Sequence, residues 1–152
     1  MPLSTGDIAP DFSLPDHKGE TVSLSHILKD GPVVIFFYPK DETPGCTKQA
    51  CSFRDHYERL VEEGLTVMGI SRDSGSSHQS FSQNHNLPYP LLSDTDGKVH
   101  HKYGCLSMMG LLPRRVTYLI GEDRKIQLVH EDNFRMESHV EVVLGYIQDM
   151  GN

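Results

Sequence analysis

The chain has 152 residues, of which 37% are hydrophobic, and its formal net charge is −7. This length and apolar fraction suit a single domain, residues 1–152, built around one core. The acidic balance disfavours nucleic acid and anionic membrane surfaces as partners, so we expect neither.

The cysteine content and the N-terminus bear on the compartment. Three cysteines are few for a secreted scaffold of this size and leave one unpaired, which favours a reducing compartment and chemical roles for the thiols. The first residues, MPLSTGDIAP, do not show the basic region followed by an apolar one that a secretory signal has. No run approaches the roughly 20 apolar residues of a membrane span. We therefore expect a cytoplasmic protein.

The first half of the chain predicts alternating strands and helices. Phe12–Leu14 and Thr21–Leu24 flank the turn-forming D-H-K-G and predict a short hairpin. Val33–Tyr38, with the sequence VVIFFY, is apolar without polar alternation and predicts a buried strand. A helix is expected from about Pro44 to Glu63, and a second buried strand over Leu65–Ser71.

The second half continues the alternation and closes on a helix. In chain order, we expect a helix capped by Ser76 or Ser77, an extended segment over Leu87–Leu92, a turn at Asp94–Gly97, a short helix over Lys98–Tyr103, a hairpin of Val116–Ile120 with Lys125–His130, and an amphipathic helix over Ser138–Met150. The expected fold class is therefore α/β, with a central mixed β-sheet flanked by helices.

Cys46 stands where the first buried strand gives way to a helix. Pro44 and Gly45 interrupt the strand, and the following T-K-Q-A begins the helix. A thiol in the first turn of a helix faces unpaired backbone N–H groups and the positive end of the helix dipole, which stabilise a thiolate. The sequence therefore indicates that Cys46 is reactive.

The residues around Cys46 also resemble a known family. Pro39, Thr43 and Cys46 fit the pattern P-x-x-x-T-x-x-C, and YPKDETPGCTKQACSFRD is similar to the active site of the peroxiredoxins. Cys51, five positions after Cys46, resembles the peroxiredoxin Q branch, also called bacterioferritin comigratory protein. The segments GDIAPDFSLPD and RRVTYLIGEDRKI agree with the same branch, so the resemblance covers essentially the whole chain.

This resemblance implies a fold and a reaction. The fold would be thioredoxin-like with an N-terminal β-hairpin extension, and the reaction would be thiol-dependent reduction of hydrogen peroxide and organic hydroperoxides. Cys46 would form a sulfenic acid, which Cys51 would resolve as an intramolecular disulfide, and thioredoxin or a similar dithiol would reduce it. The resemblance further implies a monomer, with no cofactor and no metal.

The other matched residues have expected roles in that reaction. A cysteine with the ordinary pKa of about 8.5 is already a few per cent thiolate at neutral pH, so acidity alone can raise the rate only some tens of times. Most of the acceleration must come from holding the peroxide and stabilising its leaving oxygen. By resemblance, Arg115 does both and Thr43 supplies a hydroxyl. Pro39 is expected to shield the thiolate, and the backbone N–H groups of Gly45 and Cys46 to complete the donor set.

The spacing of the first two cysteines raises a geometric question. If Cys46 and Cys51 lie on one regular helix, their Cα atoms are about 8.6 Å apart. A disulfide requires Cα atoms within about 6.8 Å, so the first turns of the helix must unwind before the sulfurs meet. Gly45 makes that unwinding easier. The alternative is that Cys51 is a buried core cysteine.

Other residues also admit alternatives. Thr43 before Pro44 is an ordinary helix start, with Thr as the cap and Pro at the first helical position. Arg114 is a second guanidinium beside Arg115, and the Arg-x-Thr-Tyr pattern favours Arg115. Cys105 is expected to be a small buried or half-buried hydrophobe, with a redox role as the alternative.

Two sets of histidines and cysteines do not predict a metal site. His100 and His101 are adjacent and point in different directions on a helix. Cys46, Cys51 and His56 lie at about 0°, 140° and 280° around a helix and cannot converge on one ion.

Two other functional classes share some of these features. A general disulfide oxidoreductase would have the same fold and a cysteine at the helix start, but it would be expected to show C-x-x-C, which this sequence lacks. A non-enzymatic redox sensor or holdase would not need Arg115 or Thr43. Consumption of peroxide in the presence of thioredoxin, its reductase and NADPH would separate the three classes.

Overall fold

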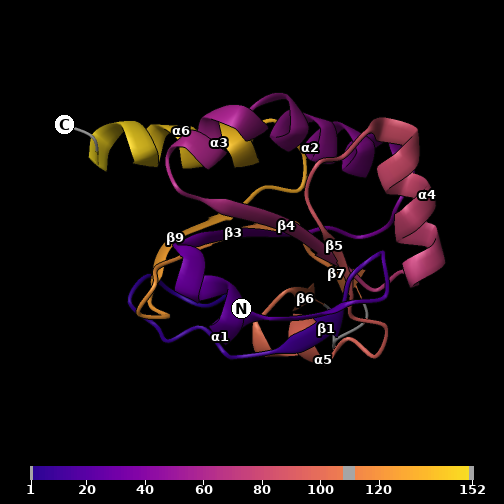
Figure 1. Ribbon diagram of the computed structural model, residues 1–152, viewed down its shortest axis with the longest axis horizontal. Coiled ribbons are helices and arrows are strands. Elements are labelled where there is room, and N and C mark those ends of the chain that lie inside the picture. Colours follow the sequence, from indigo (N-terminus) through magenta and orange to yellow (C-terminus); the bar gives the residue numbers. More distant parts are fainter. Residues whose placement is uncertain (1, 108–111, 151–152) are drawn as a thin grey trace.

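A five-stranded mixed sheet forms the centre of the molecule (Figure 1). The computed structural model describes residues 2–107 and 112–150. The strand order is β5-β4-β3-β8-β9, with bounds Leu91–Ser93, Thr66–Ser71, Val33–Phe37, Val116–Ile120 and Ile126–Glu131 respectively. Because β3 is parallel to β4 and antiparallel to β8, the expected mixed sheet is confirmed.

The position of the central strand β3 accounts for its continuous apolar sequence. All of its residues are fully buried, since other elements cover both faces of the sheet, and a strand buried on both faces has no need of polar alternation. At its carboxyl end, Phe37 lies opposite Ile70 of β4 on one side and Val116 of β8 on the other. The end of β3 therefore meets the end of β4 and the start of β8 at one edge of the molecule.

Helices cover one face of the sheet, and short helices and a hairpin cover the other (Figure 1). The first face carries α2 (Pro44–Asp55), α3 (Tyr57–Glu62), α4 (Gly75–His85) and α6 (Ser138–Met150). The second carries α1 (Leu24–Ile27), the 3-10 turn η1 (Leu28–Asp30), α5 (Lys98–Lys102) and the hairpin of β1 (Ser13–Pro15) with β2 (Thr21–Ser23). The core is accordingly divided into two apolar clusters, one on each side of the sheet. The expected N-terminal hairpin is confirmed.

The helix predicted from Pro44 to Glu63 is wrong in its middle, where the structure interrupts it. His56 has φ −110° and ψ 11°, outside helical values, and separates α2 from α3. Its ring Nδ1 lies 2.9 Å from the carbonyl oxygen of Ser52, which a helix would reserve for a backbone N–H. The side chain thus competes with the backbone and ends α2 there.

The helix cap predicted at Ser76 or Ser77 is also wrong. Ser74 is the cap of α4, and its Oγ accepts a hydrogen bond from the backbone N–H of Ser77 at 3.2 Å. A cap residue serves the N–H groups two or three positions ahead of it, so the helix begins earlier than the serine run suggests. A further antiparallel pair, β6 (Leu106–Ser107) with β7 (Leu112–Pro113), is too short to leave a pattern in the sequence.

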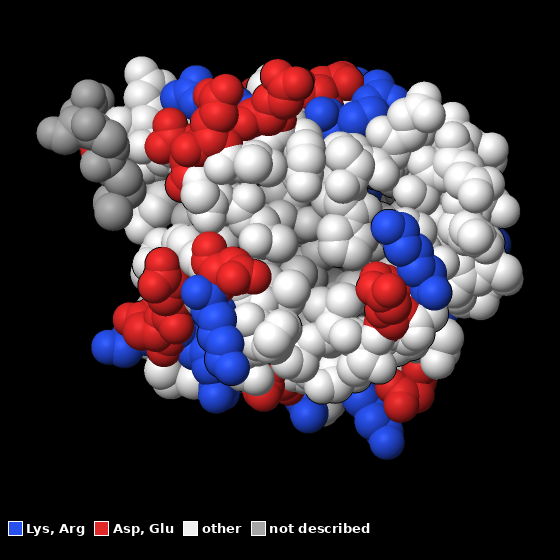
Figure 2. Space-filling model, viewed as in Figure 1, with Lys and Arg blue, Asp and Glu red and all other residues white. Residues whose placement is uncertain are grey.

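Charged side chains are mixed over the face in Figure 2, where acidic groups gather over α3 and α6 beside basic ones. Arg59 and Glu63 form one exposed ion pair, at 3.7 Å, and such pairs contribute little to stability. Within residues 2–107 and 112–150, no helix combines the length and the apolar character that crossing a membrane requires.

Candidate active site

Cys46 lies in the first turn of α2 and is fully buried. Two groups donate hydrogen bonds to its sulfur. One is Nη1 of Arg115, at 3.0 Å, and the other is the backbone N–H of Lys40, at 3.5 Å. A sulfur that accepts two hydrogen bonds, one of them from a cation, is held and oriented for nucleophilic attack.

The sheet brings Arg115 to this sulfur. Arg115 directly precedes β8, whose first residue, Val116, pairs with Phe37 at the end of β3. The backbone N–H of Arg115 donates a hydrogen bond to Oδ1 of Asn133 at 3.0 Å, which holds the backbone in place just before β8 begins. A Cβ at position 45 would lie 2.8 Å from Nη2 of Arg115, so Gly45 leaves the space that the guanidinium occupies.

Thr43 and Pro39 flank the sulfur in the segment that joins β3 to α2. Thr43 occupies the cap position of α2, but its hydroxyl caps no helical N–H and instead donates to the carbonyl oxygen of Lys40 at 3.0 Å. The hydroxyl oxygen retains its capacity to accept a hydrogen bond. Pro39 is half-buried in the same segment. Their roles toward peroxide stay predictions.

Gln49 is a site residue that the sequence analysis did not single out. It lies three positions after Cys46 on α2 and is fully buried, and its Oε1 accepts a hydrogen bond from Nη1 of Arg115 at 3.1 Å. Among the described residues its Nε2 has no hydrogen-bond partner. A polar residue one turn along the helix from a reactive cysteine is the signal that would have pointed to it.

Cys51 lies on the same helix as Cys46, which the spacing argument requires. It is half-buried, and all three cysteines are free thiols. Burial raises the pKa of the Cys51 thiol, so less of it is thiolate while the helix is intact. The structure does not bear out the alternative of a fully buried core cysteine.

Cys105 lies on the opposite side of the sheet from Cys46. It belongs to the apolar cluster beneath α1 and α5, whereas Cys46 belongs to the cluster beneath α2 and α6. It is fully buried, and burial raises its pKa far above the ordinary value for a thiol. This location fits the expected role of a small hydrophobe.

The residues that the structure describes contain one group with metal-ligand geometry, and its atoms are already engaged. Asp41, Asp73 and His78 place ligand atoms within 4.8 Å of one another. The carboxylate oxygens and ring nitrogen concerned accept or donate hydrogen bonds within the protein. The group is therefore a hydrogen-bonded network. His100 is buried against Asp94 while His101 is exposed, so these two histidines do not share a ligand site.

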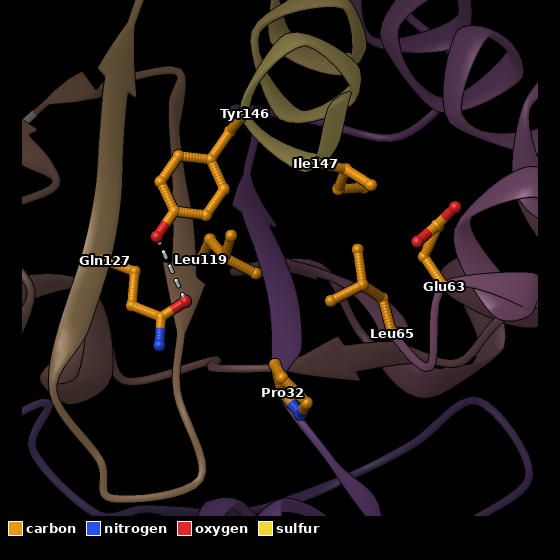
Figure 3. Close-up of a pocket in the computed structure, with 7 residues that line it drawn as sticks. All are labelled: Pro32, Glu63, Leu65, Leu119, Gln127, Tyr146 and Ile147. Carbon is orange, nitrogen blue, oxygen red and sulfur yellow. Dashed lines mark hydrogen bonds between the residues drawn. The ribbon is translucent and has the colours of Figure 1, made fainter. Parts of the chain in front are cut away.

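A groove of about 220 Å³ lies at the other end of the sheet (Figure 3). Its lining residues are Pro32, Glu63, Leu65, Leu119, Gln127, Tyr146 and Ile147. Pro32 precedes β3 whereas Cys46 follows it, so the groove and the sulfur lie at opposite ends of that strand. The lining has no cysteine, and the groove is separate from the site.

The fold and the site define a thiol peroxidase. The sequence profile of the AhpC/TSA family matches residues 5–129, more than half of the chain, so the chain belongs to this family of peroxiredoxins. Within it, the chain falls in the peroxiredoxin Q or bacterioferritin comigratory protein branch, as the following relatives show.

A peroxiredoxin Q described as chloroplastic, from Suaeda salsa, is 46% identical over 149 residues, which cover 97% of this chain and 69% of that protein. The crystal structure of peroxidoxin BcpB from Mycobacterium tuberculosis superposes with a TM-score of 0.91 at 41% identity and covers 97% of both chains. A bacterioferritin comigratory protein from Xanthomonas campestris superposes with a TM-score of 0.85 at 26% identity, covering 99% and 98%. These matches confirm the thioredoxin-like fold and the expected branch.

Proposed function

We propose that this chain reduces hydrogen peroxide and organic hydroperoxides with Cys46 as the peroxidatic nucleophile. The observation that carries the proposal is the 3.0 Å hydrogen bond from Nη1 of Arg115 to the Cys46 sulfur. The thiolate attacks one peroxide oxygen, an S–O bond forms, and the O–O bond breaks. The leaving oxygen departs as water or an alcohol after gaining a proton, and Cys46 is left as a sulfenic acid. The Xanthomonas campestris relative is described as having alkyl peroxide reduction activity, which supports the organic substrate class.

Fixed donors around the sulfur suit the charge that develops in this step. A guanidinium has five N–H donors in one plane, so Arg115 can keep its bond to sulfur and donate to a peroxide oxygen as well. Thr43 has hydroxyl lone pairs for the peroxide proton, and its own proton is already directed to Lys40. Donors that are in place before the reaction stabilise the leaving oxygen without reorganising.

Cys51 then resolves the sulfenic acid. Its thiolate attacks the Cys46 sulfur, the S–S bond forms, and the sulfenic oxygen leaves as water, which yields an intramolecular disulfide. On α2 the two Cα atoms are about 8.6 Å apart by helix geometry, beyond the roughly 6.8 Å of a disulfide. The first turns of α2 must therefore unwind.

The far part of α2 is anchored, so the unwinding concerns its start. The hydroxyl of Tyr89 donates to the carbonyl oxygen of Ala50 at 2.6 Å. Phe53 stacks on Phe36 of β3, with ring centroids 4.6 Å apart and planes at 8°. The turn that carries Cys46 is held by the hydrogen bonds to its sulfur and by the hydrogen bond from Arg115 to Gln49, and we expect it to move toward Cys51 once these bonds are released.

A thioredoxin or a similar dithiol is the proposed reductant. A disulfide in an unwound turn is exposed and closes a small loop, which favours exchange with an incoming dithiol thiolate. We further propose that residues 1–152 act as one domain and as a monomer. We place the activity in a reducing compartment and expect the cytoplasm, while the plant relatives are named chloroplastic.

Peroxide consumption tests the proposal. The wild-type chain should consume hydrogen peroxide with thioredoxin, thioredoxin reductase and NADPH, and Cys46→Ser should abolish turnover while leaving the fold intact. Disulfide reduction without peroxide consumption would indicate a general oxidoreductase, and absence of both activities a non-enzymatic role. Substantial turnover in Cys46→Ser would refute the assignment of Cys46.

A further inference from the structure

The segment that joins β3 to α2 is fixed by buried polar side chains. The carboxylate of Asp41 is almost fully buried and accepts hydrogen bonds from the hydroxyl of Tyr38 at 2.6 Å and from Oγ of Ser77 at 2.8 Å. Nδ1 of His78 donates to the same carboxylate at 2.6 Å. Burial raises the pKa of Tyr38, so its hydroxyl keeps its proton and remains a donor.

The same network holds the backbone of this segment. Oδ2 of Asp73 accepts from the backbone N–H of Asp41 at 2.7 Å and from Oγ of Ser71 at 2.9 Å. The other edge of that peptide unit, the carbonyl oxygen of Lys40, accepts from the hydroxyl of Thr43 at 3.0 Å. A planar peptide unit held at both its nitrogen and its oxygen cannot rotate.

Fixing this peptide sets the direction of the preceding donor. The N–H of Lys40 points to the Cys46 sulfur at 3.5 Å. Upstream, the N–H of Tyr38 is tied to β4 at 3.1 Å, and Pro39 has its φ fixed by its ring. With both ends of the segment held, few torsions remain by which the Lys40 N–H could turn away from the sulfur.

Helix α4 holds the segment at a second point. Glu42 has a φ of 62°, a strained value for a residue with a side chain. Its carboxylate accepts hydrogen bonds from Nδ2 of Asn84 at 2.6 Å and from Nε2 of His85 at 2.8 Å. His78 and His85 are about two turns apart, so they lie on the same side of α4. Two consecutive carboxylates of the segment, those of Asp41 and Glu42, are thus attached to one side of one helix.

We propose that Asp73 and the Asp41–His78 pair are positioning residues that direct the Lys40 N–H at the Cys46 sulfur. The inference rests on the proposed role of Cys46 as the peroxidatic cysteine. These residues act through the backbone of Lys40, which is the group that touches the sulfur. Loss of one hydrogen bond to a charged group slows the peroxide step by about tenfold.

A pair of variants at Asp73 tests the proposal. In Asp73→Ala the acceptor for the Asp41 N–H is lost, so the single-turnover reaction with hydrogen peroxide should slow by about tenfold. In Asp73→Asn the amide oxygen still accepts that N–H, so most of the rate should be retained. Reduction of the oxidised enzyme by dithiothreitol should be unchanged in both. Ser71→Ala removes the two hydrogen bonds between the Ser71 hydroxyl and Asp73, one to the carboxylate and one from the backbone N–H, but leaves the acceptor for the Asp41 N–H in place. It should slow the peroxide step less and serves if Asp73→Ala does not fold.

Asp94→Ala is the matched control for Asp73→Ala. Asp94 and His100 form a second buried pair of the same kind, at 2.7 Å, between β5 and α5. This variant should lower the melting temperature without slowing the peroxide step. Wild-type rates in Asp73→Ala, equal slowing in Asp73→Asn, or equal slowing in Asp94→Ala would each overturn the inference. If Cys46→Ser is inactive while Asp73→Ala is fully active, the positioning role fails and the proposed function stands.

Discussion

The guanidinium of Arg115 and the sulfur of Cys46 are joined by a 3.0 Å hydrogen bond although 69 residues separate them in the chain. The partners belong to parts of the fold that differ in stability. Arg115 is continuous with β8 in the sheet, whereas Cys46 lies in the first turn of α2, where helices open most readily. If that turn unwinds as proposed, the Arg115 guanidinium should stay with the sheet, in place for the next thiolate.

Arg115 should act mainly on the transition state with peroxide. Arg115→Ala is expected to lower the second-order rate with hydrogen peroxide by about 10²–10³-fold, the usual cost of removing one donor from a developing oxyanion. Arg114 forms a partly exposed ion pair with Glu131 at 3.4 Å, so Arg114→Ala is the control and should react near the wild-type rate. Stopped-flow kinetics, together with titration of the thiolate absorbance, measures both effects. If the rate loss were no larger than the loss of thiolate, Arg115 would act only by making the Cys46 thiol more acidic.

Oxidation should join Cys46 to Cys51 within one chain and leave Cys105 free. The structure separates Cys105 from Cys46 by the full thickness of the sheet, and only Cys51 shares a helix with it. Peptide mapping of peroxide-treated protein checks this, with Cys105→Ser as a control that should retain turnover. Cys51→Ser should still react once with peroxide and lose efficient recycling by thioredoxin. A disulfide between Cys46 and Cys105, or one between two chains, would contradict the prediction.

The start of α2 should lose hydrogen-exchange protection on oxidation. The range from Cys46 to Phe53 contains the turn that is proposed to open, and the loss should be largest before Ala50, whose carbonyl is anchored by Tyr89. The segment Gly75–His85 of α4, capped by Ser74, is the internal control and should keep its protection. Equal protection of Cys46 to Phe53 in reduced and oxidised protein would show that the disulfide forms without unwinding.

His139 should make the fold less stable in acid. Its Nε2–H donates to the carbonyl oxygen of Asp132 and its Nδ1 accepts from the hydroxyl of Thr117, both at 2.8 Å, which suits a neutral ring. Burial lowers its pKa from 6.5 to about 4, opposed by the Asp132 carbonyl and assisted by the nearby His130 and Arg115. As the pH falls, the unfolded chain therefore takes up this proton before the folded chain does. The stability that the neutral His139 contributes is complete above pH 6.5 and declines as the pH falls toward 4.

The expected slope is about 1.4 kcal/mol of unfolding free energy per pH unit within that window. His139→Gln retains a donor and an acceptor without titrating, so its unfolding free energy should fall less steeply with acid. Urea unfolding of both proteins at several pH values gives the difference. Parallel slopes for wild type and variant would assign the acid sensitivity to other groups.

Hydropathy and turn chemistry were enough to predict most of the fold. The expected bounds of β3 and β4 agree with the structure to within one residue, because strands buried on both faces are continuous apolar runs. The helix over Ser138–Met150 follows from its apolar face, of which Val140 and Val143 are buried. The break at His56 was missed because it depends on where one ring directs its nitrogen.

Side-chain contacts between distant segments could not be predicted in this way. The motif and its register pointed to Cys46 and Arg115, and the structure brings them together. Asp73 lies 32 residues from Asp41 in the chain, and no local sequence pattern indicates that its carboxylate accepts a hydrogen bond from the Asp41 backbone N–H. The role of the Lys40 N–H could not be predicted from the sequence for a similar reason. Every residue except proline has a backbone N–H, and only the three-dimensional structure shows which one lies at the sulfur.

The pairing of β8 with β3 also limits where insertions and deletions can be tolerated in the sequence. Successive side chains of a strand face opposite ways, so one residue inserted or deleted between Arg115 and Ile120 would carry the guanidinium to the wrong side of the sheet. On the proposed role of Arg115, such a change should abolish peroxide capture. The exposed turn at Glu122 and Asp123 lies beyond the register with β3. Insertions and deletions should therefore be tolerated at that turn and selected against in the strand before it.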